Sequence, residues 1–203
     1  MSDIADQFNK FFPQKFVLET PRVILRPLLF DDYTGLLPIS VSAEIFKYFT
    51  KDLSDPKELE NWMTEAFADK ELFKRMPFLI YDKDAKQTAG STSYGNISFY
   101  DKRVEIGWTW LGTEFIGTGL NKHAKFALLC YAFEVMKMER VEVKTDALNE
   151  RSKSALLKVG MIPEGILRNH MQMHSDRRRD SMYFSIIRNE WPERKESFFS
   201  EML

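Results

Sequence analysis

The sequence predicts a single α+β domain built on a mixed, mostly antiparallel sheet of about seven strands, with helices on both faces. Three observations support this prediction. Three strand-like segments, at about 77–82, 88–99 and 104–111, are separated only by short polar connections. The longest apolar stripe of helical spacing, within 120–136, follows directly. Strand and helix patterns then alternate, an order typical of a mixed sheet.

The composition is that of an ordinary globular protein, with 44% hydrophobic and 29% charged residues in 203 positions. The formal net charge is −1, so we expect no nucleic-acid partner and no affinity for anionic membranes. The single cysteine, Cys130, lies in an apolar run, where we expect it to fill the core. We see no signal peptide and no apolar run long enough to span a bilayer, which predicts a cytoplasmic protein.

The N-terminal part is expected to contribute a lead-in and one strand. Residues 1–15 are predicted to be loosely ordered, with Phe8, Phe11 and Phe12 available to dock on the body. Residues 17–27 follow the period of a half-buried strand, because apolar and polar side chains alternate. The domain is therefore expected to begin at residue 16.

Helices are predicted in the next stretch. Residues 30–37 and 43–49 favour short helices in an aromatic-rich region. A longer helix is predicted over 56–74, with Asp55 as N-cap and Glu58 completing a capping box.

The C-terminal half is expected to complete the sheet. We predict a strand over 140–145, a helix over 150–159 and an antiparallel pair over 162–173 and 181–188, joined by a turn at 175–177. Asn149 is the expected N-cap of the second helix, and Gly160 its left-handed end. The domain is expected to end at residue 192, before a polar tail over 193–203 that is short enough for one helix at most.

A glycine-rich loop separates the strand over 104–111 from the long helix. It carries Gly112, Gly117 and Gly119. Glycines allow close approach of main-chain N–H groups to a ligand, and a helix N-terminus adds unpaired donors and partial positive charge. This combination suits a pyrophosphate. The loop matches neither a Walker motif nor G-x-G-x-x-G, and by itself it is equally well explained as a simple chain reversal.

A second segment of interest begins the helix at 150–159. Asn149 precedes this helix and Ser152 lies in its first turn. By themselves, these residues are explained most simply as structural features of a helix start.

The two segments belong to a longer series of motifs. The series comprises residues 20–27, 105–108, 117–121, 149–152, 160–168, 179–183 and 190–192. Their joint order and spacing resemble those of the GCN5-related N-acetyltransferases (GNAT), and especially the branch that contains the bacterial ribosomal-protein N-terminal acetyltransferases. The resemblance covers about residues 16–192.

This resemblance implies acetyl-CoA as cosubstrate, inserted between the strand before the glycine loop and the next strand. It assigns main-chain contacts with the pantetheine arm to Trp110, Leu111 and Gly112, and pyrophosphate contacts to the N–H groups of Ile116, Gly117, Thr118, Gly119, Leu120 and Asn121. Asn149 would reach the pantetheine arm, and Lys153 the coenzyme phosphates. The loop departs from the family pattern at Glu114 and Ile116, where the family usually has basic or Gln residues. We therefore expect weaker coenzyme binding.

Direct acetyl transfer to an amine needs a base, an oxyanion donor and a proton for the leaving thiolate, but no enzyme nucleophile. The resemblance suggests a main-chain N–H near Leu111 as oxyanion donor, Ser152 as proton donor and Glu105 as general base. His170 and His174 are rival bases. Each of these side chains also has a purely structural interpretation, and no metal ion is expected.

The acceptor is constrained by amine chemistry. An α-amine has a pKa of about 7.7–8.0, whereas lysine has about 10.4, so a sparsely equipped site favours the α-amine of a peptide or another amine of low pKa. Phe46, Tyr48, Phe49 and Trp62 either wall the acceptor pocket or fill the core.

Two alternative functions remain open at this point. One is a non-catalytic acyl-CoA-binding regulator on the same fold. The other is a ribosome-associated protein that uses Arg177, Arg178 and Arg179 for contact, although Asp176 and Asp180 flank this expected hairpin turn and favour a solvated surface. By resemblance, the protein is expected to be a monomer or a homodimer.

Overall fold

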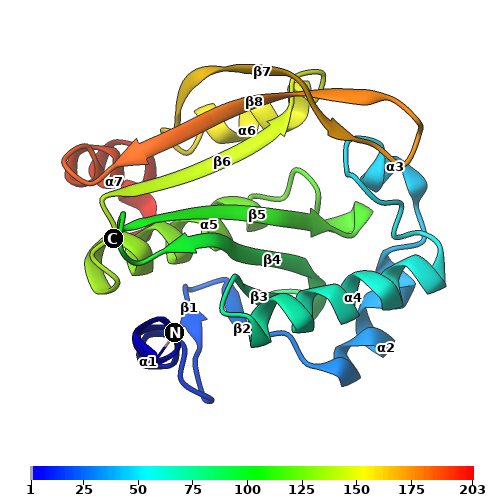
Figure 1. Ribbon diagram of the computed structural model, residues 1–203, viewed down its shortest axis with the longest axis horizontal. Helices are drawn as coiled ribbons and strands as arrows, with labels where there is room; N and C mark the ends of the chain where they lie inside the picture. Colours follow the sequence, from blue (N-terminus) through cyan, green and yellow to red (C-terminus); the bar gives the residue numbers. More distant parts are fainter. Residues whose placement is uncertain (1) are drawn as a thin grey trace.

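Eight strands form one sheet in the order β1-β2-β3-β4-β5-β6-β8-β7 in the computed structural model, which describes residues 2–203 (Figure 1). The strands are β1 (Leu18–Glu19), β2 (Val23–Pro27), β3 (Arg75–Asp82), β4 (Gln87–Ser98), β5 (Arg103–Leu111), β6 (Arg140–Asp146), β7 (Ile162–Gln172) and β8 (Arg178–Ile187). Every neighbouring pair is antiparallel except β5 and β6, which are parallel. The predicted fold class is confirmed, with eight strands rather than about seven.

The additional strand arises because the segment expected as one strand over 17–27 folds back on itself. Pro21 cannot donate a main-chain hydrogen bond to a sheet. The Thr20 hydroxyl accepts a hydrogen bond from the main-chain N–H of Val23 at 3.0 Å and closes a tight turn. β1 consequently pairs with β2 instead of continuing it.

Seven α-helices accompany the sheet among the described residues: α1 (Ser2–Phe11), α2 (Tyr33–Leu36), α3 (Ala43–Phe46), α4 (Pro56–Glu71), α5 (Leu120–Cys130), α6 (Glu150–Leu157) and α7 (Trp191–Phe199). The prediction of a loosely ordered lead-in is wrong for residues 2–11, because Phe8 and the following Phe12 are buried and anchor α1. At the other end, α7 crosses the predicted boundary at 192, and Phe199 is fully buried.

The predicted helix caps are largely confirmed. Asp55 caps α4 by accepting from the N–H of Lys57 at 2.7 Å, but Glu58 bonds Asn61 instead of closing a capping box. Gly160, with a φ of 77°, follows the end of α6 as expected. The long helix predicted over 120–136 is α5 followed by a single π-helical turn over Tyr131–Val135.

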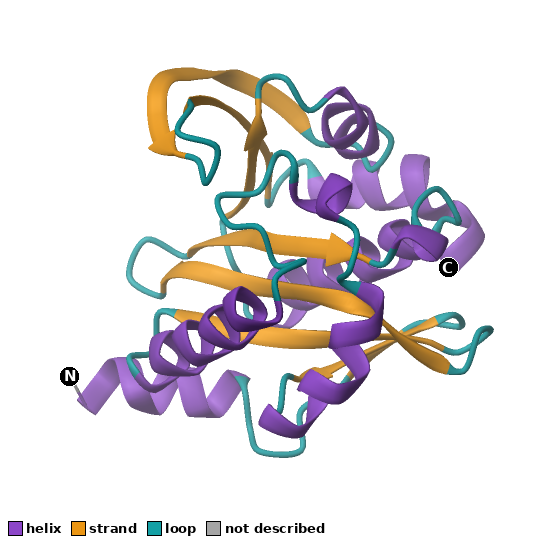
Figure 2. Ribbon diagram, turned by 90° about the vertical axis from the view of Figure 1, so that its right-hand side faces the viewer, coloured by secondary structure: helices purple, strands orange, loops and turns teal. Residues whose placement is uncertain are grey.

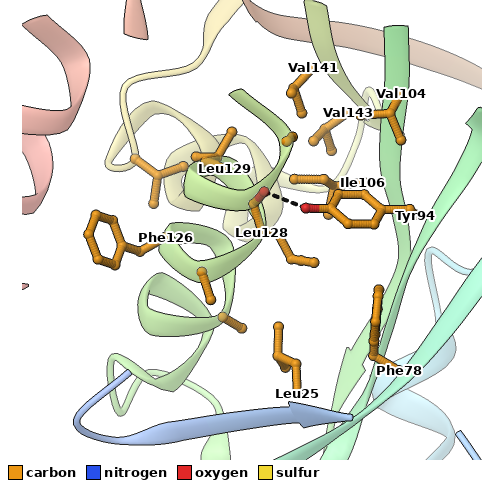
Figure 3. Close-up of a cluster of buried hydrophobic side chains, with 14 of the residues drawn as sticks. Leu25, Phe78, Tyr94, Val104, Ile106, Phe126, Leu128, Leu129, Val141 and Val143 are labelled. Carbon is orange, nitrogen blue, oxygen red and sulfur yellow. Dashed lines mark hydrogen bonds between the residues drawn. The ribbon is translucent and has the colours of Figure 1, made fainter. Parts of the chain in front are cut away.

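Helices lie on both faces of the sheet (Figure 2), and an apolar cluster fills the space between the sheet and the helices on each face. On one face, α5 packs against Leu25, Phe78 and Ile106, and the buried hydroxyl of Tyr94 donates to the carbonyl of Leu128 in that helix (Figure 3). On the other face, α2, α3 and α4 pack on the sheet through Leu36, Phe46, Leu59 and Trp62. No helix within residues 2–203 combines the length and the apolar character needed to cross a membrane.

The join between β5 and β6 is short. Only three residue pairs form it, from Arg103 opposite Arg140 to Glu105 opposite Glu142. Both strands continue beyond these pairs without pairing to each other, and Figure 1 shows them diverging. The sheet is therefore split into two parts that separate toward the carboxyl ends of β5 and β6.

Candidate functional site

The divergence of β5 and β6 brings the two sequence-predicted segments to one edge of the sheet. Parallel strands end at the same edge. The glycine loop follows β5, and the start of α6 follows β6. Loops at the carboxyl ends of parallel strands are a common position for ligand sites in α/β sheets. The fold thus places the glycine loop and Asn149–Ser152 on either side of the opening.

The glycine loop has the local geometry of an anion site. Gly117 and Gly119 have φ values of 81° and 88°, which disfavour other residues. A Cβ atom on Gly117 would meet nothing within 4 Å, and one on Gly119 would meet only the Arg22 guanidinium at 3.8 Å. Space beside the loop is therefore open, and the glycines serve backbone conformation rather than tight packing.

The main-chain donors of this loop fall into two groups. Ile116 donates to the carbonyl of Thr113 at 3.2 Å, and Leu120 makes a long contact of 3.4 Å with the Thr118 hydroxyl. For Gly117, Thr118 and Gly119, the described part of the chain provides no acceptor to the main-chain N–H. These three unpaired donors precede α5, whose N-terminus adds partial positive charge. They fit a diphosphate.

Arg22 fixes this loop from another part of the sheet. Its guanidinium donates to the carbonyl of Thr118 and pairs with Asp82 of β3 at 3.1 Å. Burial tends to raise the pKa of Asp82, but its bonds with Arg22 and nearby main-chain N–H groups outweigh burial and lower it. Arg22 lies in the motif over residues 20–27, but no role was predicted for it. Its contact joins positions 96 residues apart, which no local pattern reveals.

At its C-terminal end, β5 is hydrogen-bonded to β4 along one edge, and its other edge faces the opening between β5 and β6. Trp110 and Leu111 pair with Ser91 and Gly90 of β4, and the N–H of Gly112 donates to Ala89 at 2.9 Å. The register of this pairing shifts between Ser91 and Ser93, a β-bulge. Such a bulge bends the strand and increases its twist. Here it accompanies the separation of β5 from β6.

The start of α6 carries a free hydroxyl. Asn149 caps the helix, because its Oδ1 accepts from the N–H of Ser152 at 3.0 Å. The Ser152 hydroxyl itself bonds no other residue in the described chain. Lys153 is tied to the carbonyl of Ala147 at 2.8 Å and to Glu150 at 2.6 Å. Beside this start lies a hollow of about 220 Å³, lined by Glu44, Tyr48, Leu148, Asn149, Glu150 and Arg151.

Glu105 lies where β5 and β6 begin to separate and is only 3% exposed. Its Oε2 accepts from the amide of Asn96 at 2.6 Å and from the ammonium of Lys144, on β6, at 2.5 Å. The carboxylate is therefore salt-bridged, and Oε1 makes neither of these contacts. Lys144 and Asn96 were not predicted as site residues, although Lys144 occupies a polar position among buried valines of β6.

The predicted solvated turn at Arg177, Arg178 and Arg179 is only partly correct. Arg178 is exposed, but Arg177 pairs with the buried carboxylate of Asp146. Arg179 is 7% exposed and lies in β8, with its Nε donating to Ser181 at 2.9 Å. The difference arises because the turn ends at Arg177 and alternation along β8 then directs Arg179 inward.

The remaining residues singled out in the sequence are two histidines, one cysteine and a group of aromatic residues. His170 contacts the Ser181 hydroxyl at 2.9 Å, whereas His174 makes a long contact of 3.4 Å with the carbonyl of Phe46. Cys130 is half-buried, and burial raises the pKa of its thiol to about 12, so the thiol is in its protonated, weakly nucleophilic form at neutral pH. Phe46 and Trp62 are core residues, and Tyr48 lines the hollow beside α6. Among the described residues, no group of three or more His, Cys, Asp or Glu side chains could hold a metal ion.

Comparison with known proteins decides the family. Residues 22–162 match the model of the acetyltransferase (GNAT) domain. The chain belongs to the GNAT acetyltransferase family. The GNAT relative "Putative ribosomal N-acetyltransferase YdaF" of Bacillus subtilis is 30% identical over 113 residues, which are 56% of this chain and 59% of that protein.

Solved structures agree with this membership. The GCN5-related N-acetyltransferase of Brucella melitensis has a TM-score of 0.85 and 25% identity, over 95% of this chain and 87% of that one. RimJ of Mycobacterium smegmatis, solved in complex with CoA-disulfide, has a TM-score of 0.73 and 20% identity, over 89% and 91% of the two chains, and so shares the fold. The protein is thus an N-acetyltransferase of the GNAT family, and the family fold implies acetyl-CoA as cosubstrate.

Proposed function

We propose that this GNAT enzyme transfers the acetyl group of acetyl-CoA to a primary amine of low pKa, either the α-amine of a peptide or that of a small molecule. The observation that carries the proposal is the set of unpaired main-chain donors at Gly117, Thr118 and Gly119, on the same sheet edge as the free hydroxyl of Ser152. The name of the relative "Putative ribosomal N-acetyltransferase YdaF" is consistent with an α-amine acceptor.

Each proposed donor-binding role has a physical basis. The N–H groups of residues 117–119 and the start of α5 would bind the diphosphate. Because these donors belong to the main chain, the side chains of the loop contribute little to diphosphate binding. The presence of Glu114 and Ile116 would therefore weaken coenzyme binding without abolishing it. The unpaired edge of β5 from Trp110 to Gly112 would face the pantetheine arm, together with the Asn149 amide. Lys153 already bonds Glu150 and would contribute to phosphate binding only after leaving that partner.

The chemical step follows from the same residues. The neutral amine attacks the thioester carbonyl, a C–N bond forms and the C–S bond breaks. Glu105 would accept the proton that the amine loses, directly or through water, and Ser152 would protonate the leaving thiolate. General acid or base help of this kind is worth about 10²–10⁴-fold in rate. A main-chain N–H near Leu111 would stabilise the oxyanion.

An acceptor screen tests the proposal. Purified protein would be incubated with acetyl-CoA and a panel of peptides and small amines, with thiol release as the readout and mass spectrometry of the products. We expect thiol release to coincide with a product that is heavier by one acetyl group on its α-amine. Calorimetric binding of acetyl-CoA without transfer to any acceptor would instead support a regulator, and RNA binding with a steep salt dependence but no coenzyme binding would support ribosome association.

A further inference from the structure

Charged side chains are concentrated on the face of the sheet that carries Glu105. Lys144 and Asp146 lie on the same face of β6, and their Cα partners in β8 are Tyr183 and Ser181. In antiparallel pairs, residues opposite each other share a face. Arg179, two residues before Ser181, therefore lies on this face too. The second part of the split sheet thus presents a mostly polar wall beside Glu105.

The carboxylates of this wall are already neutralised. Glu142, opposite Glu105, pairs with Arg140 at 2.8 Å. Glu105 pairs with Lys144 at 2.5 Å, and Asp146 pairs with Arg177. Arg179 has no carboxylate within ion-pair distance in the described chain. Its Nε bonds Ser181, and neither terminal nitrogen meets an acceptor there. Because Arg179 is more than nine-tenths buried, burial lowers its pKa, and its positive charge is uncompensated by any direct contact.

A second buried cation faces the same region from β3. Arg75 is opposite Gly95, and Gly95 is opposite Glu105, so Arg75 shares this face. Its guanidinium lies 5.0 Å from the Trp62 ring and 4.6 Å from the Trp108 ring, and its Nη2 is buried without a partner. Burial lowers the pKa of Arg75 to about 10. Arg75 thus contributes positive electrostatic potential on this face of the sheet, but it is too buried to bind a ligand directly.

The pKa of His170 depends on both its burial and these charges. Burial lowers its pKa first, and the nearby Lys144 and Arg179 lower it further, against the opposing effect of Glu105. Because neither Arg179 nor Arg75 has a carboxylate within ion-pair distance in the described chain, the wall next to Glu105 carries excess positive charge, which disfavours polycationic acceptors.

We infer that the acceptor of this transferase carries a carboxylate close to its reactive amine, and that Arg179 binds this carboxylate. A guanidinium presents its terminal N–H groups in a fork that matches a carboxylate. In Arg179 these groups are the ones without a protein partner. The inference rests on the proposed function, since it names the class of amine that the site acetylates: peptides with an acidic first or second residue, or amino-acid-like molecules.

The test compares acceptors that differ only in one charge. Two C-terminally amidated peptides would be used, one starting Asp-Ala-Ala and one starting Asn-Ala-Ala, with thiol release measured over a range of peptide concentration. We expect kcat/KM to be about tenfold to a hundredfold higher for the acidic peptide, the range of a charged hydrogen bond. Arg179→Gln should bring this ratio close to one, mainly through KM, and Arg179→Lys should keep part of it.

Arg178→Gln is the matched control, because it removes the same charge from the adjacent, exposed position, where Arg178 bonds Asn169. It should leave the ratio unchanged. Thermal unfolding would verify that the Arg179 variants fold. Equal kcat/KM for the two peptides in the wild type would overturn the inference and leave the transferase activity intact.

A binding measurement keeps the two proposals distinguishable. Each peptide would be titrated calorimetrically into wild-type protein saturated with CoA. If no peptide is acetylated, tighter binding of the acidic peptide would still support the carboxylate site while the proposed function fails. Equal binding of the two peptides, or preference for the neutral one, would overturn the inference.

Discussion

Arg22, at the turn before β2, donates a hydrogen bond from its guanidinium to the main-chain carbonyl of Thr118 in the glycine loop. The same guanidinium is paired with Asp82, which is only 1% exposed. The loop proposed to hold the coenzyme diphosphate is therefore positioned by a side chain anchored in the first part of the sheet.

Replacement of Arg22 should loosen the loop. We expect Arg22→Ala to raise the KM for acetyl-CoA about tenfold, the effect of losing a hydrogen bond from a charged donor, with a smaller change in kcat. Asp82→Asn removes the ion pair but keeps the bond to Thr118, and it should change KM much less. Steady-state kinetics of both variants checks this, and equal effects of the two substitutions would contradict a role of Arg22 in positioning the loop.

The left-handed conformation of Gly119 gives a second prediction. Gly119→Ala should lower the free energy of unfolding by about 1–2 kcal/mol, because an L-residue is strained at a φ of 88°. It should also weaken CoA binding, since the strain is relieved by moving the loop. Gly119→Asn is the matched control, because asparagine tolerates this region and little surrounds the site. Denaturant unfolding measures the stability of the two variants, and calorimetry measures their affinity for CoA. We expect Gly119→Asn to retain more of the wild-type stability and affinity than Gly119→Ala.

Ser152 and Asn149 should respond differently to truncation. Ser152→Ala removes a hydroxyl that contacts no described protein group, so we expect lower turnover with nearly unchanged stability and coenzyme affinity. Asn149→Ala also removes the helix cap and should cost about 1 kcal/mol of stability. Kinetics at saturating acetyl-CoA together with thermal unfolding separate the two. An unchanged kcat in Ser152→Ala would remove Ser152 from the chemical step.

The buried Lys125 predicts an unusual dependence of stability on pH. Its ammonium donates to the Thr109 hydroxyl at 3.2 Å, and burial lowers its pKa from 10.5 to about 7. Between these values the unfolded chain binds a proton that the folded chain lacks, so this group makes stability rise with pH, by at most about 1.4 kcal/mol per unit. Below about pH 7 both states are protonated, and the full cost of burying the charge remains.

Lys125→Met preserves length and removes the charge. We expect this variant to be more stable than wild type near pH 6, and the difference to shrink as the pH rises through the window from about 7 to 10.5. Urea unfolding of the two proteins side by side at several pH values measures this difference and cancels other titrating groups. A difference that stays constant over this window would show that Lys125 remains charged in the folded protein.

Sequence patterns predicted helices and strands well wherever hydrophobic periodicity or a helix-capping residue determined them. The glycine loop, the Asp55 and Asn149 caps and the left-handed Gly160 follow from local rules, because their partners lie within a few residues. The split of the first strand was missed because alternation in 17–27 outweighed the signal of Pro21. The docking of α1 depends on burial of Phe8 and Phe12 against distant segments, which the sequence only permits.

The site was predicted less completely, for the same physical reason. Ser152 and the loop glycines belong to motifs that occur together in the sequence. Lys144, Asn96 and Arg75 gain their roles from strand register, because each becomes a neighbour of Glu105 or of its face only when the strands align. Arg179 was assigned to the surface because three adjacent arginines resemble a solvated turn, and only the exact start of β8 directs one of them inward.

The three-residue join between β5 and β6 leaves each strand with main-chain groups that no neighbouring strand satisfies. A substrate that lies along both edges, with amide groups of its own, would act as a removable ninth strand and complete the sheet. Binding of the acetyl donor would then also complete the main-chain hydrogen bonding of the sheet. Amide protons in the last residues of β5 and β6 should accordingly exchange with solvent quickly in the free enzyme and slowly once acetyl-CoA is bound.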